Sequence, residues 1–269
     1  MHKNAQFTSL TPDRIRRMKK NPFLIFALIV FALSCSDPGD PEKVLARARK
    51  YFRQGNYEKA LQDHIWFHNN ALKYKPSLYG IRLSFALLDW IELGKKYPKA
   101  HNKLIDIRIE NTEQIKNKHG TLELFHDVKS INKYLNENGK TVALYKEIVD
   151  CDFELAKKCY DLAKEDLISH EEFGLCNRFM KAPLFIVRDM RQMLDKNIKI
   201  YKTNPWADEV HLAWTKKHYL KEAEYTLIVL VKNNRFAEAE RFLLEASKDI
   251  DIAKIRDGLT RLRNKYMKN

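Results

Sequence analysis

The chain has 269 residues, and 49 lysines and arginines against 35 aspartates and glutamates give it a formal net charge of +14. Hydrophobic residues make up 45% of the sequence, which is enough for a sizeable core in one elongated domain or two small ones. Only four cysteines occur in the whole chain, so a small fold held together by many disulfides is excluded.

The N-terminal segment predicts an export signal that begins at Met18. Lys19 and Lys20 give it a basic start, an apolar run of 12 residues extends from Pro22 to Leu33, and Cys35 follows. The run is too short to span a bilayer, which takes about 20 residues. It fits the central region of a cleaved signal, which is about 7–15 residues long. The alternative is a buried N-terminal helix.

The segment Ala32-Leu33-Ser34-Cys35 resembles the lipobox of bacterial lipoproteins, although that family usually has Leu where this chain has Ala32. The resemblance implies that the Cys35 sulfur is lipidated and that Cys35 becomes the new N-terminus. We therefore expect a signal and extension at 1–34, a tether at 35–41 and a helical domain at 42–269. The expected location is the bacterial envelope, and Ser36 is compatible with an outer membrane whose anchored proteins face the periplasm.

The net charge of the rest of the chain and its three other cysteines do not identify a chemical function. Residues 1–34 carry a net charge of +5, which leaves +9 for residues 35–269. An exported basic protein meets anionic lipid and acidic polymers, but a lysine-rich helical surface would give the same charge. Cys151, Cys159 and Cys176 cannot all pair, and we expect them to act as small hydrophobic residues.

From residue 42 onward the pattern predicts an all-α chain. Apolar residues recur at steps of three and four, as amphipathic helices require. Short turns between the helices favour stacked antiparallel pairs. The expected helices span 42–54, 57–74, 79–95, 98–118, 122–136, 141–150, 153–167, 182–200, 205–217, 219–233, 236–247 and 250–266.

Three segments repeat one layout, in which a turn is followed by an aromatic residue and then by an alanine three positions later. In two of them a second alanine follows seven residues on, so both alanines lie on one helix face and let a partner helix approach closely. The aromatic residue is expected to fill the gap beside the alanine. The repeat residues are Gly55, Tyr57, Ala60, Phe153, Ala156, Ala163, Phe236, Ala239 and Ala246.

These segments resemble the tetratricopeptide repeat (TPR) family, whose unit is a helix–turn–helix of about 34 residues. Trp90 to Tyr97 fits the family's W-x2-L-G-x2-Y opening. Ala60, Ala156 and Ala239 follow no fixed period, so the repeats are degenerate. The resemblance implies antiparallel helix pairs stacked into a TPR-like right-handed α-superhelix.

In TPR superhelices the first helix of each pair lines a concave surface that holds the ligand. By that resemblance, we expect a protein or peptide partner to contact Arg49, Phe52, Arg53, Arg82 and Asp89. Arginine suits carboxylates because its planar guanidinium donates two parallel hydrogen bonds. The alternative is that these residues belong to a solvated outer face.

No metal, cofactor or catalytic site is predicted. His64 and His68 are four residues apart and could face one metal, but no third ligand is placed by the sequence, so packing among aromatic residues is expected instead. The acid pairs Asp150/Asp152 and Glu171/Glu172 do not make a glycosidase site, which needs carboxylates held across a cleft. A helix cap is expected from the first pair.

A cluster of lysines surrounds two aromatic residues toward the C-terminus. Such a surface could touch lipid headgroups, whereas nucleic acid is not expected as a partner of an exported protein. The members of the cluster are Lys199, Lys202, Lys216, Lys217 and Lys221, around Tyr201 and Trp206.

The sequence thus predicts a lipid-anchored scaffold, without catalysis, that binds a protein or peptide and contacts the membrane through Cys35. One alternative is an exported α-helical enzyme acting on envelope glycan, and another is a cytoplasmic TPR protein with an uncleaved N-terminal segment. A deep pocket with two facing carboxylates favours the enzyme, and an open groove favours the scaffold. The partner's identity and the oligomeric state stay open.

Overall fold

The computed structural model describes residues 39–267, which form thirteen α-helices and no strand. The predicted export signal and the predicted lipidation site Cys35 lie outside these residues. Within the described part of the chain, no helix is long and apolar enough to cross a membrane. The all-α prediction is therefore confirmed for residues 39–267.

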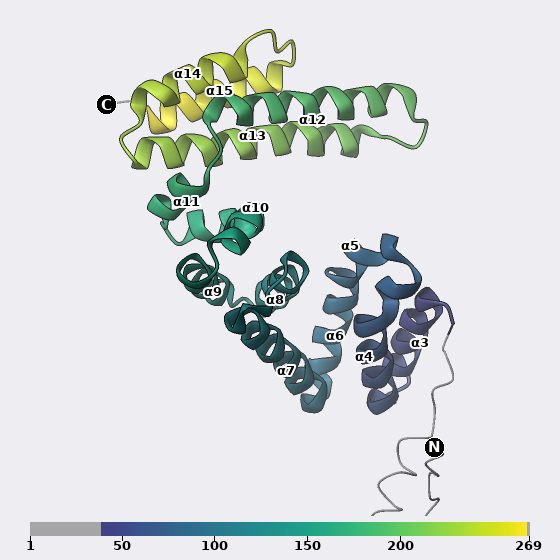
Figure 1. Cartoon of the computed structure of the whole chain (residues 1–269). Coiled ribbons are helices and arrows are strands. Elements are labelled where there is room, and N and C mark those ends of the chain that lie inside the picture. Colours follow the sequence, from purple (N-terminus) through teal and green to yellow (C-terminus); the bar gives the residue numbers. More distant parts are fainter. Residues whose placement is uncertain (1–38, 268–269) are drawn as a thin grey trace, which may run out of the picture.

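The helices follow one another along an open arc (Figure 1). The first part of the arc consists of α3 to α7 and the middle of α8 to α11. The last part consists of the long helices α12 and α13 together with α14 and α15. Their bounds are α3 Pro41–Arg53, α4 Tyr57–Tyr74, η2 Pro76–Leu78, α5 Tyr79–Arg82, α6 Phe85–Lys96, α7 Pro98–Gln114, η3 Ile115–His119, α8 Leu122–Tyr134, α9 Asn138–Cys151, α10 Phe153–Ser169, α11 Phe173–Phe179, α12 Pro183–Thr203, α13 Glu209–Lys232, α14 Phe236–Ser247 and α15 Ala253–Tyr266.

One type of turn ends four of the helices. The second residue after the helix takes a positive φ, and the next backbone N–H donates to the carbonyl five residues back, which satisfies a free carbonyl at the helix end. At Gly55, with φ +73°, the bond runs from Asn56 N–H to the Tyr51 carbonyl at 2.9 Å. The same bond follows Asn136, Glu171 and Asn234.

A second type of connection uses a single residue between consecutive helices. Tyr97 alone separates α6 from α7, and Asp152 alone separates α9 from α10. Both have non-helical backbone angles, and each donates its N–H to the carbonyl four residues back at 2.8 Å. Pro98 and the Asp152 carboxylate, which accepts from Leu155 N–H at 3.0 Å, then start the following helices. Helices joined in this way fold back on one another.

The apolar core is divided into clusters that follow one another along the chain. Two clusters lie among α3–α8, a third among η3–α11, and a fourth among α12–α15. The third includes Val229 of α13, and Met180 packs against both the third and the fourth. Each group of helices therefore buries its apolar face mainly against its sequence neighbours, as in quasi-one-dimensional helical arrays.

A buried aromatic donor recurs in three helix pairs. Trp90 Nε1 donates to the Ala100 carbonyl at 2.9 Å, and Tyr145 Oη donates to the Ala156 carbonyl at 3.1 Å. Tyr219 Oη does the same to the Ala246 carbonyl at 2.7 Å. Each bond satisfies a buried polar group and fixes how the two helices face each other.

Most predicted helices are present, and three differences have physical causes. The predicted helix 79–95 is broken at Leu83 and Ser84, where Ser84 turns its hydroxyl to the Gly80 carbonyl at 2.6 Å. The two predicted helices 205–217 and 219–233 are joined in one helix, α13, because no glycine or proline lies between Glu209 and Lys232. Helix α11 was not predicted, since its seven residues are too short to show a period.

The repeat residues divide into two groups. The alanines lie fully buried between helices, as predicted for Ala60, Ala156, Ala163, Ala239 and Ala246. Of the aromatics, Tyr57 is half-buried, whereas Phe153 and Phe236 are 42% and 49% exposed, so the prediction that the aromatic fills the gap beside each alanine is wrong for these two.

Candidate functional site

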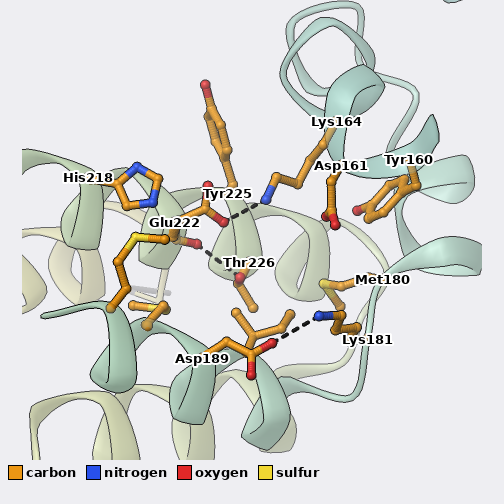
Figure 2. Close-up of a pocket in the computed structure, with 13 residues that line it drawn as sticks. Tyr160, Asp161, Lys164, Met180, Lys181, Asp189, His218, Glu222, Tyr225 and Thr226 are labelled. Carbon is orange, nitrogen blue, oxygen red and sulfur yellow. Dashed lines mark hydrogen bonds and ion pairs between the residues drawn. The ribbon is translucent and has the colours of Figure 1, made fainter. Parts of the chain in front are cut away.

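A cavity of about 350 Å³ lies where the middle of the arc meets its last part. This volume lies in the range of small-ligand and side-chain pockets. Helix α10, the connection between α11 and α12, and the facing sides of α12 and α13 all contribute to its wall (Figure 2). Its lining residues are Tyr160, Asp161, Lys164, Met180, Lys181, Ile186, Asp189, Met190, Met193, His218, Glu222, Tyr225 and Thr226.

One side of the cavity is apolar and rich in methionine. Met180, Ile186, Met190 and Met193 come from the connection before α12 and from α12 itself. Met190 is buried, whereas Met193 is 42% exposed. Methionine is unbranched and polarisable, so such a wall adapts to apolar groups of different shape.

Two ion pairs lie at the cavity, and Figure 2 shows both. Lys164 Nζ on α10 lies 2.6 Å from Glu222 Oε2 on α13, and Lys181 Nζ lies 2.9 Å from Asp189 Oδ2. The hydrogen bond from Lys181 lowers the pKa of Asp189. The Lys164 ammonium also lies 5.9 Å from the centre of the Tyr225 ring. The cavity therefore carries two ion pairs, and in each of them a lysine balances the charge of a carboxylate.

Tyr160 forms part of the cavity wall, and its buried hydroxyl is unusual. The residue is 6% exposed, and its hydroxyl has no nitrogen or oxygen partner among the described residues. It lies next to the Cys176 thiol, and burial raises the pKa of Tyr160 and raises that of Cys176 to about 11. Both groups are therefore protonated at neutral pH, and a buried donor without a good acceptor costs free energy.

The residues predicted to contact a partner lie elsewhere, at the start of the arc. Arg49 on α3 and Asp89 on α6 are brought together, with Nε and Oδ2 2.7 Å apart. Phe52 is half-buried and lies 5.9 Å from the Tyr57 ring, whereas Arg53 is exposed. None of these four residues lines the cavity.

Arg82 differs from its predicted exposed position, because the structure buries it at 8% exposure. Its guanidinium donates to both carboxylate oxygens of Asp127 on α8, at 2.5 and 2.7 Å. Its Nε donates to the His68 carbonyl at 2.6 Å. The side chain joins α5 to α4 and α8, and it does not face solvent.

The two histidines on α4 are packed side chains, as predicted. His64 and His68 are 2% and 6% exposed, and their rings lie 5.7 and 6.0 Å from the Trp90 ring. Burial lowers the pKa of each to about 4, so both are neutral at neutral pH. Within residues 39–267, no group of three histidine, cysteine, aspartate or glutamate side chains is placed to hold a metal ion.

One acid of each predicted pair has a structural partner. Asp152 caps α10, as predicted, whereas Asp150 lies inside α9. Glu172 pairs with Lys146, with Nζ and Oε1 2.8 Å apart, and Glu171 takes the positive φ of a turn.

The predicted basic cluster is drawn from two helices and the connection between them. Lys221 is paired with Glu165 of α10, with Nζ and Oε1 2.8 Å apart. Lys199 and Lys202 lie near the end of α12, and Trp206 follows in the connection to α13. The Tyr201 hydroxyl donates to Glu209. The lysines before Trp206 and those after it therefore belong to different helices.

The cavity was not predicted from the sequence. Its residues come from three separate segments, 160–164, 180–193 and 218–226, and none carries a motif. One signal was present, because three methionines, Met180, Met190 and Met193, fall within 14 residues of a chain that has six. Their gathering on one wall depends on how α12 packs against α10 and α13.

No protein-family model, no curated protein and no solved structure matches this chain.

Proposed function

We propose that this protein is a lipid-anchored, envelope-facing helical scaffold that binds a protein or peptide partner without catalysis. The observation that carries the proposal is the cavity between α10, α12 and α13, with a methionine-rich wall beside two ion pairs. An apolar side chain of a partner can pack against the methionines, while the charged groups hold polar atoms on either side of it.

The finer architecture is part of the same proposal. We assign the chain to TPR-like antiparallel helix pairs in a right-handed α-superhelix. This assignment is supported by core clusters that follow the chain order and by alanines buried at the contacts between helices. The repeated aromatic-to-carbonyl bond from Trp90, Tyr145 and Tyr219 also favours repeated units.

The alternative of an exported glycan-cleaving enzyme receives less support from the same cavity. Its Glu222 and Asp189 carboxylates are each held by a lysine, at 2.6 and 2.9 Å. The pKa of Asp189 is lowered, whereas a carboxylic acid that protonates a leaving group needs a raised one. These pairings favour binding over acid–base chemistry.

The binding proposal is tested by placing a charge on the methionine wall. Met193→Asp is expected to weaken partner capture from envelope extracts by about tenfold or more, because an unpaired carboxylate against apolar groups costs more than about 1.4 kcal/mol. Leu244→Asp is the matched control, since Leu244 is exposed on α14 and does not line this cavity. A partner that both variants retain equally, or lose equally, would contradict the proposal.

The anchor is tested separately by the intact mass and membrane fractionation of the natively expressed protein. We expect a diacylated or triacylated species that begins at Cys35 and sediments with membranes, and a Cys35→Ser variant without the lipid. An unlipidated full-length chain in the soluble fraction would refute the anchor and favour the cytoplasmic alternative.

A further inference from the structure

The free end of the α12–α13 hairpin carries a surface that the proposed function does not use. Figure 1 shows the connection between α12 and α13 beyond the ends of α14 and α15. We call this region the tip surface and define it by its apolar and basic members on α13, α15 and the preceding connection. They are Trp206, Val210, Trp214, Lys217, Lys254 and Arg261.

The apolar members are unusually exposed. Trp206 is 91% exposed, Val210 is 72% exposed and Trp214 is 52% exposed, and all three fall within nine residues. Val210 and Trp214 line a shallow hollow of about 680 Å³ between α13 and α15, whereas Trp206 lies outside it. A group of large apolar side chains in water is a mark of an interaction site.

The basic members are not neutralised within the protein. Lys217, Lys254 and Arg261 line the same hollow as Val210 and Trp214, and none has an ion pair within 4 Å among the described residues. Glu224, the acid that lines this hollow, is already paired with Lys265, whose Nζ lies 2.8 Å from Glu224 Oε1. Asp208, Glu209 and Asp257 are near in sequence but do not line the hollow. The tip surface therefore presents positive charge beside exposed tryptophan.

We propose that the tip surface docks on an anionic phospholipid bilayer. Tryptophan settles at the headgroup level because its ring is apolar and its N–H stays hydrated, while lysine and arginine are attracted to anionic headgroups. An acidic helix lying in the hollow would leave Trp206 in water. A bilayer is extended enough to cover the hollow and the projecting Trp206 together. The contact depends neither on the cavity nor on a lipid at Cys35.

The test uses the full chain with Cys35→Ser, so that no covalent lipid contributes. Binding is measured by co-sedimentation with vesicles of phosphatidylcholine alone and with vesicles that contain equal amounts of phosphatidylglycerol. We expect binding to the anionic vesicles that falls as salt rises and is weak on the neutral ones. Lys217→Gln with Lys254→Gln should weaken it about 25-fold, since each lysine near the surface contributes about fivefold.

Two matched controls distinguish binding through the tip surface from a general effect of net charge or of exposed aromatic residues. Lys43→Gln with Lys50→Gln removes the same charge from α3, and Phe85→Ser removes an aromatic residue that is 62% exposed on α6. Both should bind like the parent chain. Trp206→Ser with Val210→Ser should bind less while keeping the parent's unfolding midpoint, because both side chains are exposed.

Tryptophan quenching by brominated lipid gives a second measurement. The chain has four tryptophans, Trp66, Trp90, Trp206 and Trp214, so residues 1–38 contribute none to the signal. We expect anionic brominated vesicles to quench the parent chain and a Trp206→Phe, Trp214→Phe variant to lose that quenching. Equal binding to neutral vesicles, an equal loss in the α3 control, or a preference for duplex DNA or an acidic peptide over anionic vesicles would overturn the proposal.

Discussion

Replacing Asp127 with alanine is expected to lower the free energy of unfolding by about 3–5 kcal/mol, because it leaves a buried charge without a partner. Asp127 is 6% exposed and accepts two hydrogen bonds from Arg82, which is itself buried. Without this carboxylate, the guanidinium between α4, α5 and α8 keeps its charge and loses its counter-ion. Urea denaturation followed by circular dichroism measures the change.

Two comparisons make the Asp127→Ala result specific. Glu92→Ala breaks an exposed pair with Lys95 and should cost less than about 1 kcal/mol. Arg82→Leu with Asp127→Leu removes both buried charges and should recover most of the lost stability. A loss below about 1 kcal/mol for Asp127→Ala would show that the pair does not hold α5 and α8 together.

Lowering the pH from 6.5 to 4 is expected to destabilise the fold steeply through His64 and His68. Their pKa in the folded protein is about 4, whereas an unfolded histidine has a pKa of about 6.5. Between these values the unfolded chain binds more protons, so their contribution is complete above pH 6.5 and is lost as the pH falls. The slope is about 1 kcal/mol per pH unit for each histidine, and urea midpoints across this range measure it.

The variant His64→Phe isolates this effect from the titration of carboxylates. His64 stacks on Trp90, and its Nδ1 has no hydrogen-bond partner among the described residues, so phenylalanine keeps the packing and removes an unsatisfied atom. Carboxylates titrate in both proteins and cancel in the comparison. We expect the variant to lose about half of the histidine-dependent slope. An unchanged slope would mean that His64 does not stay neutral in the fold.

The sequence predicted individual helices better than their arrangement. The predicted 57–74 and 236–247 coincide with α4 and α14, since Gly55 and Asn234 mark the preceding turns and apolar periodicity marks the rest. The fusion of 205–217 with 219–233 into α13 was missed because apolar periodicity weakens where a helix face is partly exposed. Trp214 on that helix is 52% exposed.

The site was harder to predict because its parts are distant in the sequence. Lys164 and Glu222, which form an ion pair, are 58 residues apart in the sequence. Met193 of α12 lines the same cavity as Tyr160 of α10. The burial of Arg82 was missed for a similar reason. An arginine in a helical pattern is expected to face solvent, and its buried partner Asp127 lies 45 residues away in the sequence. Such ion pairs depend on tertiary packing and cannot be predicted from local sequence patterns.

Photo-crosslinking in living cells tests whether the cavity binds a partner, with a photoreactive residue at position 193 on the methionine wall. We expect a discrete protein adduct from position 193 that is absent when the same residue replaces Leu244 on α14. The lack of an adduct at 193, or the same adduct from both positions, would contradict a partner site in the cavity between α10, α12 and α13.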